Sequence, residues 1–312
     1  MHISSAAAAL ALVFASGCAA VPAAEAAGPT RHRTATVDGV EVFYREAGHP
    51  DAPTLVLLHG FPSSSHMFRD LIPLLADRFH VVAPDYPGFG HSATPPSSTY
   101  TYTFDGLART VARFLEVVGE DRYVLYMQDY GGPVGFRIAT AHPDRVEGLV
   151  VQNANAFVEG FGTDTATPLA GLWEKGRSPE TEAPARALYS LEGIRWQYQT
   201  GAREPAALNP DAWTMDRALI DQPGRDDAQI RLLEDYKTNL ALYPAWQKYL
   251  HERQPRTLVV WGRNDPIFIE AGANAYRKVL PRADVVLLDT GHFALEEDAL
   301  TVAAHIIRAF GH

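Results

Sequence analysis

The chain has 312 residues, with 27 basic and 37 acidic side chains and a formal net charge of −10. Its 46% of hydrophobic and 21% of charged residues exclude a mainly disordered protein. The acidic balance argues against nucleic acid or an anionic membrane surface as a partner, and the single cysteine, Cys18, excludes an intramolecular disulfide.

The first 28 residues have the features of a targeting segment. The apolar run 6–14 is too short to span a bilayer, which takes ~20 apolar residues. The following Ala24-Glu25-Ala26 fits the A-x-A pattern of a secretory signal, and Ala15–Cys18 also resembles a lipobox, in which Cys18 would carry a lipid anchor. We expect an exported protein, periplasmic or secreted. The alternatives are a membrane-anchored lipoprotein and an Ala-rich N-terminus without export.

After this leader, strand-like and helix-like segments alternate along the chain. Asp38-Gly39 is a strong hairpin signal between strands expected over 34–37 and 40–46. Six short apolar strands are expected over 54–58, 80–83, 123–127, 146–152, 257–261 and 285–288, and helices are expected over 104–118 and up to residue 141. Short buried strands separated by helices indicate an α/β fold with a mostly parallel sheet covered on both faces.

The segment 157–253 interrupts this alternation because it contains no convincing strand. It holds four of the five tryptophans and several tyrosines, most of which should form the segment's own core. A helical insertion at the carboxyl ends of strands lies over the crevice in which open α/β sheets bind ligands. We therefore expect a helical cap between two parts of the core, 29–156 and 254–312, above a site for a small hydrophobic substrate.

Asp129 lies between an expected strand and an expected helix, and it is followed by Gly131 and Gly132. This is the arrangement of a nucleophile elbow, a sharp turn that exposes one side chain above the sheet. Met127 stands where the pattern usually has a small residue, so it should crowd the turn. An aspartate at this position could instead serve only as a helix N-cap.

Two more residues complete a catalytic set in the expected chain order. Asp265 and His292 each follow the end of an expected strand, and nucleophile, acid, histidine is the order of α/β-hydrolase triads. His292 would act as the general base, and Asp265 would orient its ring. The backbone N–H groups of Phe61 and Tyr130 could form an oxyanion hole. The same two donors would keep Asp129 ionised.

Five motifs carry a resemblance to a known family: LLHGFPSSSHMFR, APDYPGFGHS, MQDYGGPVG, VVWGRNDPIF and LLDTGHFALEED. From about residue 34, the chain resembles α/β-hydrolases of the epoxide hydrolase and haloalkane dehalogenase branch, which use an aspartate nucleophile. The resemblance implies that Asp129 attacks a saturated carbon and that His292 activates water to cleave the resulting ester. No metal or organic cofactor is called for, and the Asp and His residues lack H-E-x-x-H spacing.

The leaving group distinguishes the two activities of this branch. Dehalogenases usually have Trp after the nucleophile and often Asn after the His-Gly pair, where this chain has Tyr130 and Phe61. Epoxide hydrolases protonate the opening oxygen with cap tyrosines, and Tyr236, followed by Lys237 in place of the usual Arg, resembles one of them. Tyr198 is the candidate for the second. We expect an epoxide hydrolase that forms a diol; a haloalkane dehalogenase and a non-catalytic binding protein of the same fold are the alternatives.

Overall fold

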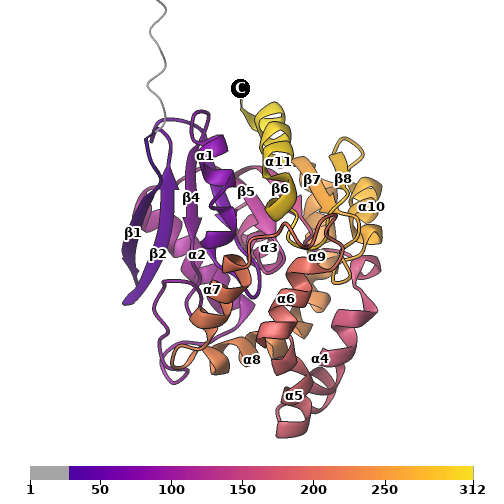
Figure 1. The fold of residues 1–312 in the computed structure, drawn as a ribbon. Coiled ribbons are helices and arrows are strands. Elements are labelled where there is room, and N and C mark those ends of the chain that lie inside the picture. The colour runs from indigo at the N-terminus through magenta and orange to yellow at the C-terminus, as the bar shows by residue number, and fades with distance from the viewer. Residues whose placement is uncertain (1–27, 312) are drawn as a thin grey trace, which may run out of the picture.

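The computed structural model describes residues 28–311, apart from the side chains of residues 164 and 165. The expected leader and Cys18 lie outside the described residues. One eight-stranded sheet forms the centre, in the order β1-β2-β4-β3-β5-β6-β7-β8 (Figure 1). Its strands are β1 (Arg31–Val37), β2 (Val40–Ala47), β3 (Thr54–Leu58), β4 (His80–Pro84), β5 (Tyr123–Gln128), β6 (Val146–Gln152), β7 (Arg256–Gly262) and β8 (Asp284–Leu288).

The pairing of the strands follows from their sequence patterns. Strand β2 runs antiparallel to β1 and β4, and every other neighbouring pair is parallel. Asp38 and Gly39 both have a positive φ, of 48° and 85°, as a two-residue hairpin turn requires. All residues of β3, β4 and β5 are buried, which explains their continuous apolar sequences. The predicted fold class, α/β with a mostly parallel sheet flanked by helices, is confirmed.

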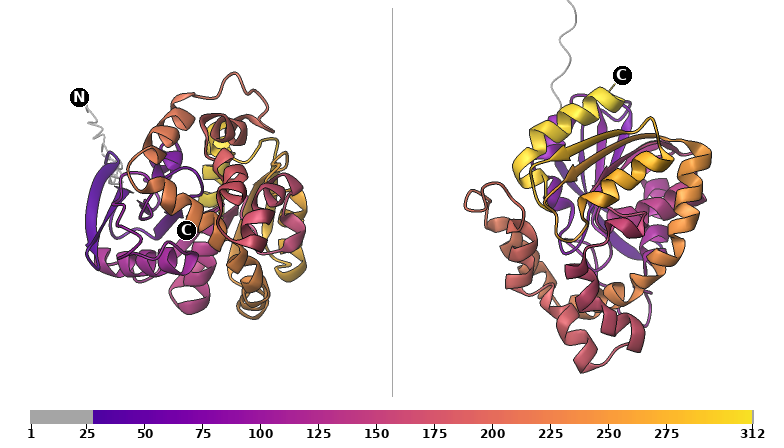
Figure 2. Two further views of the ribbon diagram at one scale, coloured as in Figure 1. Left: turned by 90° about the horizontal axis from the view of Figure 1, so that it is seen from below. Right: turned by 90° about the vertical axis from the view of Figure 1, so that its right-hand side faces the viewer.

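Helices cover both faces of the sheet (Figures 1 and 2). On one face α1 packs against α11, and on the other α2 packs against α3 and α10 against β7 and β8. These helices are α1 (Leu71–Leu75), α2 (Phe104–Val118), α3 (Gly131–Ala141), α10 (Glu270–Val279) and α11 (Leu295–Phe310), with short 3₁₀ turns at η1 (Ser65–Phe68) and η2 (Val158–Gly160). Helix α2 has the predicted bounds because Thr103 caps its first turn and Gly119, with a φ of 86°, ends it.

Six helices, here called the inserted helices, lie between β6 and β7. They are α4 (Thr163–Lys175), α5 (Pro179–Ala187), α6 (Leu191–Gln199), α7 (Asp211–Ile220), α8 (Arg225–Asp235) and α9 (Lys237–Arg253). Figure 2 shows α4 to α8 projecting from one end of the sheet, while α9 returns along the core and packs against α3. Across residues 28–311, no helix combines the length and the apolar character needed to cross a bilayer.

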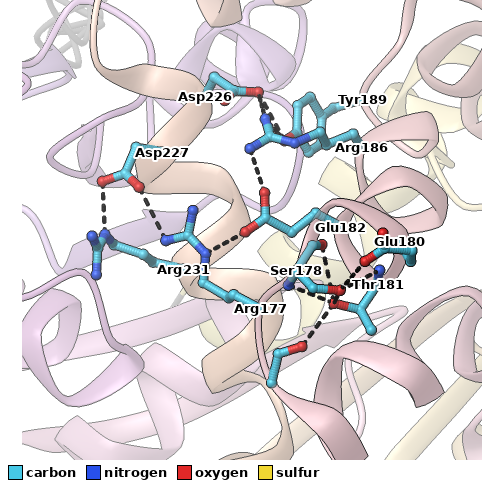
Figure 3. A network of polar contacts seen from close by, with 11 residues as sticks. Arg177, Ser178, Glu180, Thr181, Glu182, Arg186, Tyr189, Asp226, Asp227 and Arg231 are labelled. Atoms are coloured by element: carbon cyan, nitrogen blue, oxygen red, sulfur yellow. Dashed lines mark hydrogen bonds and ion pairs between the residues drawn. The ribbon is translucent and has the colours of Figure 1, made fainter.

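A network of ion pairs joins α5 to α8 within the inserted helices (Figure 3). Arg177 contacts Glu182 at 2.6 Å and Asp227 at 3.0 Å. Arg186 pairs with Glu182 at 2.7 Å and also contacts Asp226. Single exposed pairs contribute little to stability, whereas several that share partners can hold two helices together.

Candidate active site

Asp129 occupies a strained turn between β5 and α3. Its φ of 48° lies in the left-handed region, which is costly for a residue other than glycine. The helix starts very close to the neighbouring strand, since a Cβ on Gly131 would lie 2.2 Å from the carbonyl oxygen of Leu58. This turn has the backbone geometry of a nucleophile elbow, and it places the carboxylate above the carboxyl end of the sheet.

Met127 does not crowd the elbow in the way its sequence position suggests. Its side chain is fully buried and lies against α3, where a Cβ on Gly135 would be only 2.3 Å from the Met127 sulfur. A glycine one turn into the helix therefore makes room for the large side chain on the strand.

The structure brings Asp129, Asp265 and His292 together from the ends of β5, β7 and β8. His292 Nδ1 lies 2.8 Å from Asp265 Oδ2, and His292 Nε2 lies 3.8 Å from Asp129 Oδ2. All three side chains are buried. Because a carboxylate only accepts hydrogen bonds, Nδ1 carries a proton, and in the neutral ring the lone pair lies on Nε2.

The backbone N–H groups of Phe61 and Tyr130 both point at the carboxylate of Asp129. The N–H of Phe61 donates to Asp129 Oδ1 at 2.7 Å, and the N–H of Tyr130 also bonds to this carboxylate. Burial raises the pKa of Asp129 to about 6, although His292 and the two N–H groups act in the opposite direction. The two donors thus limit the rise in pKa, and the carboxylate stays mostly ionised at pH 7.

The loop that carries Phe61 is held in place by His59. Burial lowers the pKa of His59 to about 4, so the ring is neutral. Its Nδ1 lies 3.0 Å from the carbonyl oxygen of Gly60, and its Nε2 accepts a bond from the N–H of Tyr86 at 3.2 Å. His59 therefore ties the loop after β3 to the loop after β4 and has no free nitrogen for catalysis.

Asn153, which the sequence analysis did not single out, connects the parts of the triad. It follows β6, its carbonyl oxygen accepts from the N–H of Asp129, and its Nδ2 donates to Asp265 Oδ2 at 2.8 Å. Its Oδ1 accepts from the N–H of Gly262 at 2.9 Å. A signal was present in the sequence, because Asn153 stands at the carboxyl end of a buried strand, the edge at which the other site residues lie.

A cavity above Asp129 lies between the core and the inserted helices. It has about 450 Å³ of empty space, including its opening. Its walls are mainly apolar and aromatic, and they include Phe61, Tyr130 and Ile267 from the core and Leu169, Trp196 and Tyr236 from the inserted helices. Such a lining favours a small, largely apolar ligand. The described residues contain no group of three or more His, Cys, Asp or Glu side chains that could hold a metal ion.

The two tyrosines proposed as leaving-group donors have different surroundings. Tyr236, between α8 and α9, lines the cavity, and its buried hydroxyl contacts that of Tyr243 and bonds to no other described group. The hydroxyl of Tyr198 instead donates to Asp216 at 2.7 Å, and its ring stacks on Phe293 at 3.8 Å. Tyr198 is not part of the cavity wall, so the geometry does not support it as the second donor. Tyr130, which does line the cavity, has a buried hydroxyl without a partner in the described chain.

Comparisons with known proteins agree with this architecture. A family model described as alpha/beta hydrolase fold matches residues 53–299. An uncharacterized hydrolase of Saccharomyces cerevisiae is 44% identical over 288 residues, 89% of this chain and 96% of that protein. Haloalkane dehalogenase 2 of Mycobacterium tuberculosis is 31% identical over 275 residues, covering 83% and 88%.

Solved structures show the same fold. Cfl2 from Burkholderia cenocepacia superposes with a TM-score of 0.75 at 27% identity, covering 91% of this chain and 96% of that one. The epoxide hydrolase CorEH also gives a TM-score of 0.75, covering 90% and 99%, but its 22% identity indicates a likeness of fold alone. The match of the family model and the similarity to these relatives show that the chain belongs to the α/β-hydrolase fold family.

Proposed function

We propose that this hydrolase opens an epoxide to a diol through a covalent ester on Asp129. One observation carries the proposal: an apolar cavity contains the carboxylate of Asp129 and, on its wall, the buried hydroxyl of Tyr236, which contacts only the neighbouring hydroxyl of Tyr243 within the described chain. A carboxylate that attacks a saturated carbon gives a stable alkyl ester, whereas attack on an ester carbonyl gives a reactive anhydride. The site therefore fits a three-membered ether better than a carboxylic ester.

In the first step, an oxygen of Asp129 bonds to an epoxide carbon and the carbon–oxygen bond of the ring breaks. The leaving oxygen takes the proton of the Tyr236 hydroxyl and becomes an alcohol. Burial raises the pKa of Tyr236 well above its usual value, so the hydroxyl is protonated before the reaction and can donate.

In the second step, His292 Nε2 removes a proton from water, and the hydroxide adds to the Asp129 carbonyl carbon. The N–H groups of Phe61 and Tyr130 stabilise the oxyanion that forms. The bond from this carbon to the alkyl oxygen then breaks, and the leaving oxygen takes the proton of the added hydroxyl, which frees the diol and restores the carboxylate. The proton held by His292 returns the tyrosinate of Tyr236 to its neutral form.

A haloalkane dehalogenase is the second candidate, favoured by the 31% identity to a mycobacterial protein of that name. It would use the same ester on Asp129 and the same hydrolysis by His292. The difference lies in the first step, in which a halide leaves without needing a proton. The hydroxyls of Tyr236 and Tyr130 would then only donate hydrogen bonds to the departing ion.

Replacing the base tests the shared chemistry. In His292→Gln, ester formation should continue while its hydrolysis stops, so that intact-protein mass rises by the mass of the epoxide. Peptide mapping should place the adduct on Asp129. His251→Gln, at an exposed position on α9, is the control and should turn over normally.

A panel of epoxides and bromoalkanes supplies the substrates and separates the two candidates, since only the second class releases halide. No adduct with any compound that the wild-type enzyme turns over would refute the proposal. So would incorporation of heavy oxygen from labelled water directly into the diol during a single turnover, because the label should enter Asp129 first.

A further inference from the structure

Gln128, the last residue of β5, contacts the nitrogen of His292 that has to act as the base. Its side chain is fully buried, and its Nε2 lies 3.1 Å from His292 Nε2. This distance is shorter than the 3.8 Å that separates the same ring nitrogen from Asp129 Oδ2. The mechanism described above gives Gln128 no role, although it is the side chain that bonds directly to the base nitrogen.

With the amide nitrogen of Gln128 directed at Nε2 and its oxygen left without a partner among the described residues, this contact fits a neutral ring. Asp265 accepts the proton on Nδ1, so Nε2 of a neutral imidazole has a lone pair and accepts a bond from the amide of Gln128. In an imidazolium, both nitrogens carry protons, and the amide N–H₂ would face another donor. The bond from Gln128 is therefore available to the neutral form of His292 and lost on protonation.

The charges around His292 act in the opposite direction. Burial lowers the pKa of the ring, but Asp265 and Asp129, the charged groups that face it, raise the pKa above its ordinary value. A protonated His292 beside Asp129 would form a buried ion pair. That pair would occupy the lone pairs of the nucleophile and remove the base needed in the second step.

We infer that Gln128 is a positioning residue that keeps His292 neutral and separate from Asp129 in the resting enzyme. The inference rests on the proposed function, because only a free carboxylate of Asp129 can attack the epoxide and only a neutral ring of His292 can take a proton from water. Gly60 makes the arrangement possible, since a Cβ at this position would lie 2.2 Å from Gln128 Oε1. Once Asp129 has become an ester, the hydrolytic water takes the place of the amide at His292 Nε2.

Gln152 provides a matched control. It is the residue of β6 that pairs with Gln128 in the sheet, and it is also fully buried. Its Nε2 lies 3.4 Å from the backbone oxygen of His292, and its Oε1 accepts from the hydroxyl of Tyr126. Gln152 therefore contacts the same histidine without contacting the ring.

The test compares Gln128→Met, Gln128→Glu and Gln152→Met by titrating the imidazole of His292 with NMR in the absence of substrate. Loss of the donor in Gln128→Met should raise the midpoint of the titration by about one pH unit. The isosteric Gln128→Glu should raise it further, because a carboxylate stabilises the imidazolium. Gln152→Met should leave the midpoint in place even where it lowers the melting temperature.

Single-turnover alkylation gives the second measurement. At pH 6.5, Gln128→Met should form the Asp129 adduct roughly tenfold more slowly than the wild type, and the deficit should disappear at pH 9. An unchanged or lower midpoint in both Gln128 variants would overturn the inference. The NMR titration needs no turnover, so it tests the role of Gln128 by itself. The proposed function is tested separately, by the presence or absence of the adduct in His292→Gln.

Discussion

The triad and the tyrosine hydroxyls around the cavity differ in how completely their polar atoms are bonded. On the core side, His292 is bonded to Asp265, and Asp265 to Asn153 and to the N–H of Ile267 at 2.7 Å. On the opposite side, the buried hydroxyls of Tyr236 and Tyr243 contact each other and bond to no other described group. The triad is therefore held in place before substrate arrives, whereas under the proposed function the hydroxyls of Tyr236 and Tyr130 remain available to a leaving group.

Removing the hydroxyl of Tyr236 should have the largest effect on the rate of the reaction. Tyr236→Phe should slow epoxide opening by about 10²–10⁴-fold, because the leaving oxygen loses its proton donor. Tyr198→Phe is the matched control, since that hydroxyl already bonds to Asp216, and it should keep turnover within a few-fold of the wild type. Stopped-flow measurement of adduct formation compares the two. Equal losses in both variants would show that the hydroxyl of Tyr236 has no special function.

Removing bonds that hold the triad in place should have a smaller effect on the rate and a clear effect on the stability of the protein. Asn153→Gly removes the amide bonds to Asp265 and Gly262 while tolerating the native φ of 41°. We expect turnover to fall roughly tenfold or somewhat more as the triad loses its orientation. The unfolding free energy should fall by about 2–3 kcal/mol, because buried groups lose partners.

Asn155→Ala is the control for this variant. Asn155 is equally buried, but neither its amide nitrogen nor its oxygen has a hydrogen-bond partner in the part of the chain that is described. Urea denaturation and steady-state kinetics measure both proteins. If Asn155→Ala impairs turnover as much as Asn153→Gly, the bonds of Asn153 do not orient the triad.

The smallest effect on activity is expected at Asp216, which joins the inserted helices to the loop of Ser63. Asp216 on α7 is buried, which raises its pKa to about 7, although bonds from Tyr198 and Ser63 act against this rise. The folded chain thus keeps a proton that the unfolded chain loses near pH 4, so stability should fall as pH rises from about 4 through 7. Asp216→Asn should remove up to about 4 kcal/mol of this dependence and change turnover little.

Urea denaturation at pH 5, 7 and 8.5 measures this pH dependence. Asp211→Asn, at an exposed position on the same helix, should retain the slope of the wild type. An Asp216→Asn protein with the slope of the wild type would mean that Asp216 is ionised in the folded state throughout this range.

The sequence predicts the core side of the site better than the cavity wall. The sequence predicts the positions of Asp129, Asp265 and His292 because the carboxyl ends of parallel strands lie at one edge of the sheet. A residue that follows such a strand in the sequence therefore lies at that edge. Tyr198 and Tyr236 could not be distinguished in this way. Both lie on helices of the insertion, and the direction of each side chain depends on how these helices pack together.

The sequence does not reveal the importance of Gln128 and Asn153, for a different reason. Gln128 and Asn153 directly follow predicted strands, and a polar residue is common at that position in any protein. Their significance lies in partners far along the chain, His292 and Asp265, and a pattern within one segment does not reveal such partners. A polar side chain at the end of a fully buried strand was the available signal.

The bond between Asp216 and Ser63 has a consequence for protein engineering. Ser63 lies two residues after Phe61, and its hydroxyl donates to Asp216 Oδ1 at 3.2 Å, so α7 is attached to the loop that supplies an oxyanion donor. Tyr198 attaches α6 to the loop of His292 through its stacking on Phe293. A chimaera that receives its inserted helices from another hydrolase would therefore inherit both the walls of a new cavity and the supports of two catalytic loops. Transplanting these helices without Asp216 and Tyr198 would therefore remove two contacts to these loops at the same time as it changes the cavity.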